Sequence, residues 1–431
     1  MATIAEARPE AKGMPYGIGQ FGPISLLAII VLTAIVAVGA YAYAQQLIEG
    51  EIVTGLGDVG TMGGTPWGIY IVLELYAVGI GFGAMLLLAI TRIMGLSRLQ
   101  PLARTLSLIA PAALLAGALS VIVDLGQPLR GIVNLALYAR PMSPFFGTFT
   151  IGVVASLLAT AVYLYLDTRR DAALLAARSR GWGGFLRLIA AGYKDTPAAQ
   201  KRHQRTSLAL AILLLVLGVT AASTSGFVFG IQLGRPGWYG ALQGPAFLAL
   251  AGVTATGMLI VVASILRRVL GGEKRLDLSV FAWLSNLVMV LSLTYLYFLV
   301  AELLTMSYEG QYHEARLAQA LTTGTYAPLF WVSAGLLFIP FVIGAVQALT
   351  GRYSLFLIVL SGVLVNLAAL GRRFLVVVPS LTTGTLLPYG PGSYSPTWVE
   401  YTVVLGLLAL GTLLCVLFMK VLPIMEVPDK Q

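Results

Sequence analysis

Charged residues are scarce in this chain. Of its 431 residues only 10% are Asp, Glu, Lys or Arg, whereas 58% are hydrophobic, and the mean hydropathy is +0.88. A water-soluble domain needs far more surface charge to stay dispersed, so this composition excludes one. The alternating pattern of a membrane β-barrel is also missing, and the apolar runs reach the roughly 20 residues of a membrane-spanning helix. The sequence therefore predicts an all-α, polytopic transmembrane helix bundle.

Cysteine and histidine are almost absent. The single cysteine, Cys415, cannot ligate an iron–sulfur cluster or form an internal disulfide. A b-type haem in a membrane protein usually takes two histidines inside the bundle, but His203 and His313 both fall outside the apolar runs. We therefore expect no haem, no iron–sulfur cluster and no metal site in this chain. Electrons for any redox chemistry would come from another protein.

The apolar runs divide the chain into ten predicted spans. Residues 1–21 and 423–431 are predicted tails, and the first 20 residues lack the apolar core of a cleaved signal peptide. Residues 22–422 form the predicted bundle. The spans run over 22–45, 67–94, 102–124, 147–166, 206–226, 243–266, 278–300, 326–350, 354–376 and 398–422.

Basic residues lie mostly on one side of these spans. If the N-terminus is cytoplasmic, 21 of the 27 Lys and Arg residues fall on that side and 6 on the other. Short cytoplasmic loops of membrane proteins carry such an excess, so both termini are predicted to be cytoplasmic. The net charge of +9 then reflects topology and attraction to anionic membrane lipid. It indicates no nucleic-acid partner.

The segment SVIVDLGQPLRG places polar groups at the outer end of the third span. Asp124, Gln127 and Arg130 are three residues apart, so they would share one face if the helix continued. The motif Leu-Gly-x-Pro occurs at 125–128 and again at 233–236, where glycine and proline end a helix. This echo hints at two related four-helix bundles with extra helices.

Other polar side chains lie inside or at the outer ends of spans. Glu74 is about 10 Å below the outer surface, and an ionisable group at that depth predicts proton or quinone chemistry, with a structural hydrogen bond as the alternative. Glu302 ends the seventh span close to Tyr297 and Tyr308, which could equally be interfacial anchors.

Three further features have simpler alternatives. Arg372 and Arg373 lie near the outer end of the ninth span, where arginines often extend to lipid headgroups. Asp167 closes the fourth span on the cytoplasmic side, either as an interfacial charge or as a point where protons enter. The basic segment that follows it is consistent with an amphipathic surface helix. The glycine-rich GFGAML at 81–86 indicates close helix packing.

Several segments resemble the NrfD/polysulfide-reductase membrane-subunit (PsrC-like) family. They are TPWGIYIVLELYAVGIGFGAMLL, VDLGQPLRG and GIQLGRPGWYGALQGPAFLALAG. The closing YSPTWVEYTVVLGLLALGTLLCVLFMKVLP resembles the ten-helix branch of that family, which includes hydrogenase-2-type anchors and quinone reductase complex subunits. The resemblance covers most of residues 65–422.

The resemblance implies a respiratory anchor without prosthetic groups in a prokaryotic cytoplasmic (inner) membrane. Such a subunit exchanges electrons between membrane quinone, either menaquinone or ubiquinone, and an iron–sulfur (ferredoxin-like) subunit on the outer face. A molybdopterin or hydrogenase subunit would then be the catalytic partner. Of the site residues, only Asp124 is implied directly by the family motif. At Gln127 the family often has arginine. We add other polar residues because they are expected near the same outer face. The predicted proton carriers are then Asp124, Glu74 and Glu302. The predicted quinone contacts are Gln127, Arg130, Tyr297, Tyr308, Arg372 and Arg373.

Two other functions stay open from the sequence. A secondary transporter or proton-conducting protein also carries intramembrane carboxylates, although a transporter usually places its polar site near the midplane. A haem cytochrome would show a Soret band, which the histidine count predicts to be missing.

Overall fold

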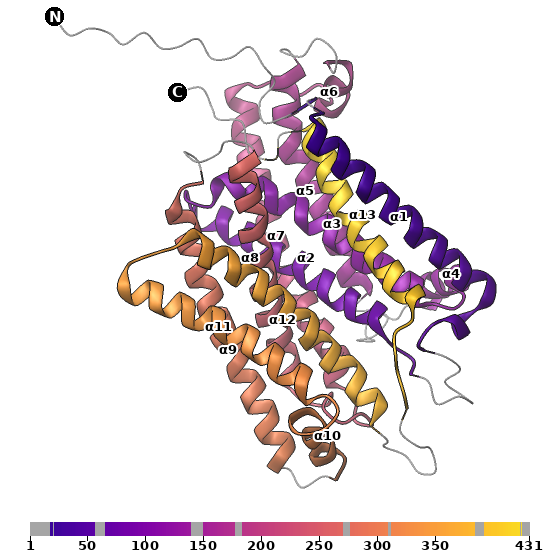
Figure 1. Ribbon diagram of the computed structural model, residues 1–431. Helices are drawn as coiled ribbons and strands as arrows, with labels where there is room; N and C mark the ends of the chain where they lie inside the picture. Colours follow the sequence, from indigo (N-terminus) through magenta and orange to yellow (C-terminus); the bar gives the residue numbers. More distant parts are fainter. Residues whose placement is uncertain are drawn as a thin grey trace, which may run out of the picture.

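The computed structural model describes residues 18–19, 21–56, 65–138, 150–176, 183–269, 276–308, 312–383, 392–422 and 424. Within these ranges every regular element is a helix (Figure 1), so the predicted all-α class is confirmed. The predicted tails 1–21 and 423–431 lie largely outside them. The elements are α1 (Pro23–Glu49), η2 (Glu51–Val53), α2 (Ile69–Ile93), α3 (Gln100–Asp124), α4 (Pro128–Tyr138), α5 (Thr150–Ala176), α6 (Gly183–Ala190), α7 (Pro197–Gly230), α8 (Gln243–Val269), α9 (Leu278–Tyr308), α10 (Tyr312–Thr322), α11 (Ala327–Thr350), α12 (Leu355–Thr382) and α13 (Trp398–Val421).

Ten of the described helices are long and apolar enough to cross a membrane, and they coincide with the ten predicted spans. The largest differences are at α5 and α7, which extend well beyond the predicted ends of the fourth and fifth spans. Helix α7 has 34 residues, about 51 Å at 1.5 Å per residue, whereas the hydrocarbon core is about 30 Å thick. Its basic first turns therefore extend past the apolar layer.

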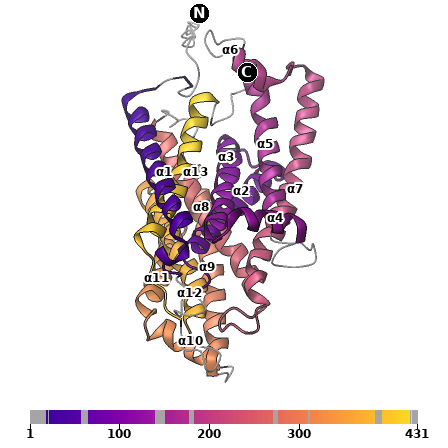
Figure 2. The ribbon, with the colours of Figure 1, turned by 90° about the vertical axis from the view of Figure 1, so that its right-hand side faces the viewer.

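Eight of the spanning helices form two closed rings of four. In one ring α2, α3, α5 and α7 pack in order around a shared core, and in the other α8, α9, α11 and α12 do so. Helices α1 and α13 lie side by side and cover α3 and α2 (Figures 1 and 2). Two four-helix bundles with extra helices are thus present. The two Leu-Gly-x-Pro motifs do not occupy equivalent positions in the two bundles. They follow α3 and α7, which are the second and fourth helices of the same ring.

Helix α2, a member of the first ring, also packs against α8 and α12 of the second ring and so lies at the centre of the bundle. A β-carbon on Gly83 would collide with the backbone carbonyl of Ala251 on α8, so glycine is required for this close approach. The GFGAML segment therefore serves helix packing, as predicted. The α1–α13 pair meets in the same way at Gly39 and Gly406, where a β-carbon on Gly39 would be 2.8 Å from the Gly406 α-carbon.

The alternating spans give the bundle two distinct ends. Helices α1, α3, α7, α9 and α12 finish at the end where α3 finishes, which we call the Asp124 end; α4 and α10 cover it (Figures 1 and 2). The opposite end, which contains Asp167 and the short helix α6, is the Asp167 end. Helix α6 lies within the basic segment that predicted a surface helix. The charge count predicts that the Asp167 end is cytoplasmic.

Candidate functional site

Asp124 is the last residue of α3, and its carboxyl points into the protein. Its Oδ1 atom is buried and has no hydrogen-bond partner among the described residues. Leu125 is extended, with φ −85° and ψ 118°, and the chain becomes helical again only at Pro128. Proline lacks the N–H that would continue the α3 ladder but fits the first turn of α4. Asp124, Gln127 and Arg130 therefore do not share a helix face, and the latter two are exposed.

The end of α3 is held by a buried glutamine from α1. Gln46 Nε2 donates to the Val123 carbonyl and to Glu51 Oε1, both at 2.9 Å. The hydroxyl of Tyr70 on α2 donates to Gln46 Oε1 at 2.7 Å. The carbonyls in the last turn of a helix lack intrahelical donors, so this amide supplies one and joins α1, α2 and α3 beside Asp124.

Glu51 places a second carboxyl at this point. It lies in η2, and its side chain packs against Gly126 of the Leu-Gly-x-Pro motif. Burial raises the pKa of the Glu51 carboxyl above its ordinary value, and repulsion from Glu400 adds to this, while hydrogen bonds from Gln46 and Thr54 act in the opposite direction. Glu51 therefore holds a proton more readily than an exposed glutamate does.

Glu400 is a third carboxyl of the group, and it is fully buried at the start of α13. Thr397 and Glu400 form a capping box, in which Glu400 Oε2 accepts from the Thr397 amide at 2.9 Å and also from the Gly55 amide at 2.6 Å. Its Oε1 accepts from the Tyr394 hydroxyl at 2.6 Å, which in turn accepts from the Ile69 amide at 2.7 Å. Burial and the neighbouring carboxylate raise the pKa of Tyr394. Glu400 thus ties the segment before α2 to the start of α13.

These groups form one acidic cluster at the Asp124 end. Asp124 lies within electrostatic range of Glu51, Glu74 and Glu400; we call these four residues the Asp124 cluster. Buried carboxylates that interact in this way repel one another when all are ionised, so the cluster is suited to taking up and passing on protons.

Glu74 extends the cluster into the bundle. It lies five residues after the first residue of α2, about 8 Å along the helix axis, and is only 3% exposed. Its Oε1 atom has no hydrogen-bond partner among the described residues, but its charge interacts with that of Arg373 on α12. The Arg373 guanidinium lies 4.0 Å from the centre of the Phe247 ring, within range of a cation–π contact.

Arg372 and Arg373 are deeper than the sequence predicted. Helix α12 continues to Thr382, six residues past the expected end of the span. Arg373 therefore lies about 14 Å along the helix axis from Thr382. Both side chains are buried, so neither extends to the headgroups. Arg372 Nε donates to the Tyr295 hydroxyl at 3.3 Å, and the Nη1 atoms of both arginines lack partners within the described ranges.

Glu302 lies in the second ring, in a separate polar group. Gln243 Nε2 donates to Glu302 Oε1 at 2.7 Å and to the Gly237 carbonyl at 3.0 Å. The Gly237 amide donates to both carboxylate oxygens of Glu314 on α10, at 3.0 and 2.9 Å. Glu302 and Arg372 also line a small cavity of about 30 Å³.

Tyr297 and Tyr308, predicted to contact a quinone, are 67% and 94% exposed. They are therefore not part of the polar group around Glu302.

The second Leu-Gly-x-Pro copy leads into this group. Trp238, two residues after the motif, donates from Nε1 to the Val376 carbonyl on α12 at 2.6 Å. Its ring stacks on Trp67, with the ring centres 5.6 Å apart. These contacts fix the segment between α7 and α8 across both rings, so the second copy of the motif serves to join them.

Residues 58–384 match the family model described as polysulphide reductase, NrfD. The chain belongs to the NrfD polysulphide reductase family. Its membership confirms the resemblance seen in the sequence, and the match spans both four-helix rings and the helix ends that carry Asp124 and Glu302.

Curated relatives of this NrfD-family chain are similar over nearly their whole length. A putative membrane subunit of the dimethyl sulfoxide reductase of Halobacterium salinarum is 26% identical, covering 96% of this chain and 94% of the relative. A selenate reductase subunit of Mesobacillus selenatarsenatis is 24% identical over 92% and 94%. The probable Ni/Fe-hydrogenase 2 b-type cytochrome subunit of Escherichia coli is 26% identical over 89% and 90%. The chain is thus similar to subunits of several different oxidoreductases.

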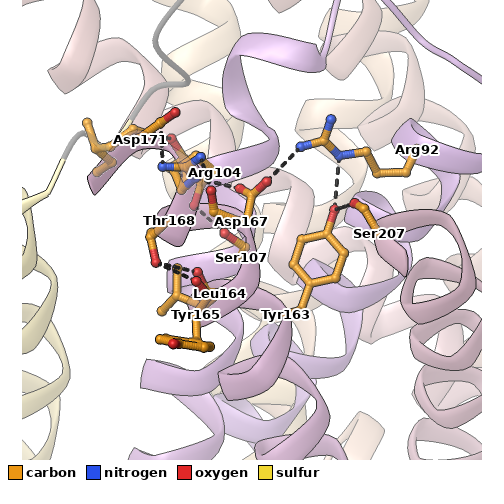
Figure 3. A network of polar contacts seen from close by, with 12 residues as sticks. Arg92, Arg104, Ser107, Tyr163, Leu164, Tyr165, Asp167, Thr168, Asp171 and Ser207 are labelled. Atoms are coloured by element: carbon orange, nitrogen blue, oxygen red, sulfur yellow. Dashed lines mark hydrogen bonds and ion pairs between the residues drawn. The ribbon is translucent and has the colours of Figure 1, made fainter. Parts of the chain in front are cut away.

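The opposite end of the NrfD-family bundle holds a buried ion network (Figure 3). Arg104 Nε lies 2.5 Å from Asp167 Oδ2, and Arg104 Nη1 lies 3.0 Å from Asp171 Oδ2. Arg92 contacts the other Asp167 oxygen at 3.3 Å and donates to the Tyr163 hydroxyl at 2.9 Å. Asp167 is therefore not a simple interfacial charge: it joins α5 to α2 and α3.

Four residues of these two polar groups were not predicted from the sequence: Arg92, Arg104, Glu51 and Glu400. Two signals could have found some of them. Arg92 and Arg104 fall inside predicted spans, where a charge needs a partner. The Thr-x-x-Glu pattern at 397–400 is the signature of a capping box. No such signal exists for Glu51, whose role depends on contacts with distant segments.

Proposed function

We propose that this chain is a quinone-reactive membrane anchor that exchanges electrons with an iron–sulfur subunit docked at the Asp124 end. The observation that carries the proposal is a set of unpaired buried polar atoms. Asp124 Oδ1, Glu74 Oε1 and the Nη1 atoms of Arg372 and Arg373 all lack hydrogen-bond partners within the described ranges. Leaving a buried polar atom unpaired costs about 1–3 kcal/mol, so a polar ligand that reaches several of these atoms would relieve several such costs.

The chemistry of these atoms fits a quinone. Its two carbonyl oxygens accept hydrogen bonds, which arginine guanidinium groups donate, and its apolar ring suits a site within helices. Reduction of a quinone to a quinol takes two electrons and two protons, and each carbonyl oxygen becomes a hydroxyl; oxidation reverses both changes. Asp124 and Glu74 would carry the protons at the two ends of the ring, and Glu51 and Glu400 would connect Asp124 with the surface of the Asp124 end.

The electrons in this proposal come from or go to the partner subunit. The substrate is menaquinone or ubiquinone, and the third protein of the complex is a catalytic subunit of the molybdopterin or hydrogenase type. The names of the relatives, a dimethyl sulfoxide reductase, a selenate reductase and a hydrogenase, support such an assembly. We place the complex in the cytoplasmic membrane of a prokaryote.

Our proposal includes no bis-histidine haem, although one relative is named a b-type cytochrome subunit. The only two histidines of the sequence are His203 and His313. His203 lies near the start of α7, at the Asp167 end, and His313 lies in α10, at the Asp124 end. They cannot ligate one iron between them, so the proposed anchor works without a bis-histidine haem.

A transporter is the competing function. Such proteins hold their substrate near the bilayer midplane, where both sides can reach it. The unpaired polar atoms of Asp124 and Glu74 instead lie in the last turn of α3 and the second turn of α2, although Arg373 lies deeper. The position of the two carboxyls near one end, together with family membership, favours the anchor.

Quinol-driven reduction of the partner tests the proposal. The native complex is purified in mild detergent, its subunits are identified, and menaquinol is added without oxygen while iron–sulfur signals are followed by electron paramagnetic resonance. We expect an iron–sulfur polypeptide to co-purify and its clusters to change oxidation state in proportion to added quinol or quinone. The proposal would be contradicted by a complex without an iron–sulfur subunit. It would also be contradicted by iron–sulfur clusters whose oxidation state changes with neither quinol nor quinone.

A further inference from the structure

A cavity of about 400 Å³ opens at the Asp167 end, far from the proposed quinone site. It lies between α5, α7 and the segment that joins α6 to α7. Four basic side chains line it, from Arg169, Lys194, Arg202 and His203. Residues with hydroxyl groups also line it: Tyr163, Tyr193, Thr196, Thr206 and Ser207. A volume of this size is typical of small-ligand sites.

The cations of this cavity are not balanced by acids. Asp167 is the one carboxylate in the lining, and it is already engaged by Arg92 and Arg104. Within the described ranges no carboxylate lies within ion-pair distance of Arg169, Lys194 or Arg202, whereas the neighbouring Arg170 approaches Asp195 at 3.5 Å. The Arg169 guanidinium instead lies over the Tyr193 ring, 5.1 Å from its centre. The cavity therefore presents an excess of positive charge.

The cavity also lies at the level of the membrane surface. The apolar spans were expected to end near Leu166 and to begin near Thr206, and both residues line the cavity. Farther along α5 and α7, toward the membrane interior, exposed apolar side chains such as Val162 and Leu213 continue the helix surfaces. A molecule bound here would have its polar part at the interface and could lay acyl chains along these helices.

We infer that this cavity binds a phosphate group. Lysine, arginine and hydroxyl donors together form the usual protein environment of a phosphate, and basic pockets between helices at the cytoplasmic surface suit anionic headgroups. The phosphate could belong to an anionic lipid such as phosphatidylglycerol or to a soluble phosphate compound. Both have the same chemistry at this site, and the experiment distinguishes them.

The test uses the whole complex with three substitutions, Arg169→Gln, Lys194→Gln and Arg202→Gln. The matched control carries Lys201→Gln and Arg205→Gln, two exposed cations of α7 that do not line the cavity. One arm measures phosphatidylglycerol retained after washing with mixed micelles of detergent and phosphatidylcholine. The other measures binding of radiolabelled inorganic phosphate to the complex in phosphatidylcholine nanodiscs.

We expect binding to weaken about fivefold per removed charge, or roughly 100-fold for the triple variant, and to change little in the control. Loss in the first arm alone identifies a lipid, and loss in the second identifies a soluble phosphate. Equal binding by wild type and triple variant in both arms would overturn the inference. If the triple variant fails to assemble, Arg202→Gln against Lys201→Gln gives the same comparison with an expected fivefold difference. Quinol oxidation should be unchanged throughout, so the result is independent of the proposed function.

Discussion

Replacing Arg104 by glutamine is expected to destabilise the protein by about 3–5 kcal/mol, the usual cost of breaking a buried ion pair by removing one partner. Arg104 is 1% exposed. It engages Asp167 through Nε at 2.5 Å and Asp171 through Nη1 at 3.0 Å, and its Nη2 donates to the Asp167 carbonyl at 3.0 Å. Without the guanidinium, two buried carboxylates lose their main counter-charge and the contact of α3 with α5 loses its polar core.

Thermal unfolding of the detergent-solubilised protein measures this effect, together with the amount of assembled complex in the membrane. Arg98→Gln is the control, because Arg98 is exposed at the same end of the bundle, and it should change stability by less than about 0.5 kcal/mol. If Arg104→Gln unfolds at the same temperature as Arg98→Gln, the network in Figure 3 does not stabilise the fold.

Replacing Asp124 by asparagine is expected to slow quinone turnover by about 100-fold or more while the complex still assembles. Loss of a positioned proton carrier typically costs 10²–10⁴ in rate. Asparagine has nearly the same shape, so the end of α3 and its bond to Gln46 should persist. Because the change removes proton transfer rather than quinone binding, kcat should fall much more than KM rises.

Steady-state quinol oxidation by the purified complex measures both constants. Asp277→Asn is the matched control: it makes the same chemical change at an exposed carboxyl before α9, at the Asp167 end. Wild-type rates from Asp124→Asn would assign Asp124 a structural role, and a rise in KM alone would indicate a binding role without proton transfer.

The membrane architecture was predictable because it depends on local composition. The length of each apolar run and the positions of basic residues are properties of short segments, and they predicted all ten spans. The ends of α5, α7 and α12 were not predicted from the apolar runs. The end of α5 continues because neighbouring helices bury its polar residues, whereas the exposed first turns of α7 extend beyond the apolar layer. Helix α12 continues six residues past the predicted end of its span, so Arg372 and Arg373 lie deeper in the bundle than the sequence indicated.

The site was predictable only in part. The motif indicated Asp124 and depth in the membrane indicated Glu74, and both belong to the Asp124 cluster. Their roles in proton transfer stay predictions. Gln127 and Arg130 are close to Asp124 in sequence, but the break between α3 and α4 turns them outward. Glu400 meets the Gly55 amide across 345 residues of chain, a contact that no local pattern specifies. Tertiary contacts of this kind, rather than helix propensity, decide which polar groups meet.

Photoaffinity labelling with an azidoquinone tests the central claim most directly. The native complex is labelled in membranes, and the modified peptides are identified with and without excess unlabelled menaquinone. If quinone binds at the Asp124 end, displaceable label is expected on the first turns of α2, the last turns of α3 or the part of α12 around Arg372 and Arg373. Displaceable label confined to the cavity between α5 and α7 at the Asp167 end would contradict it.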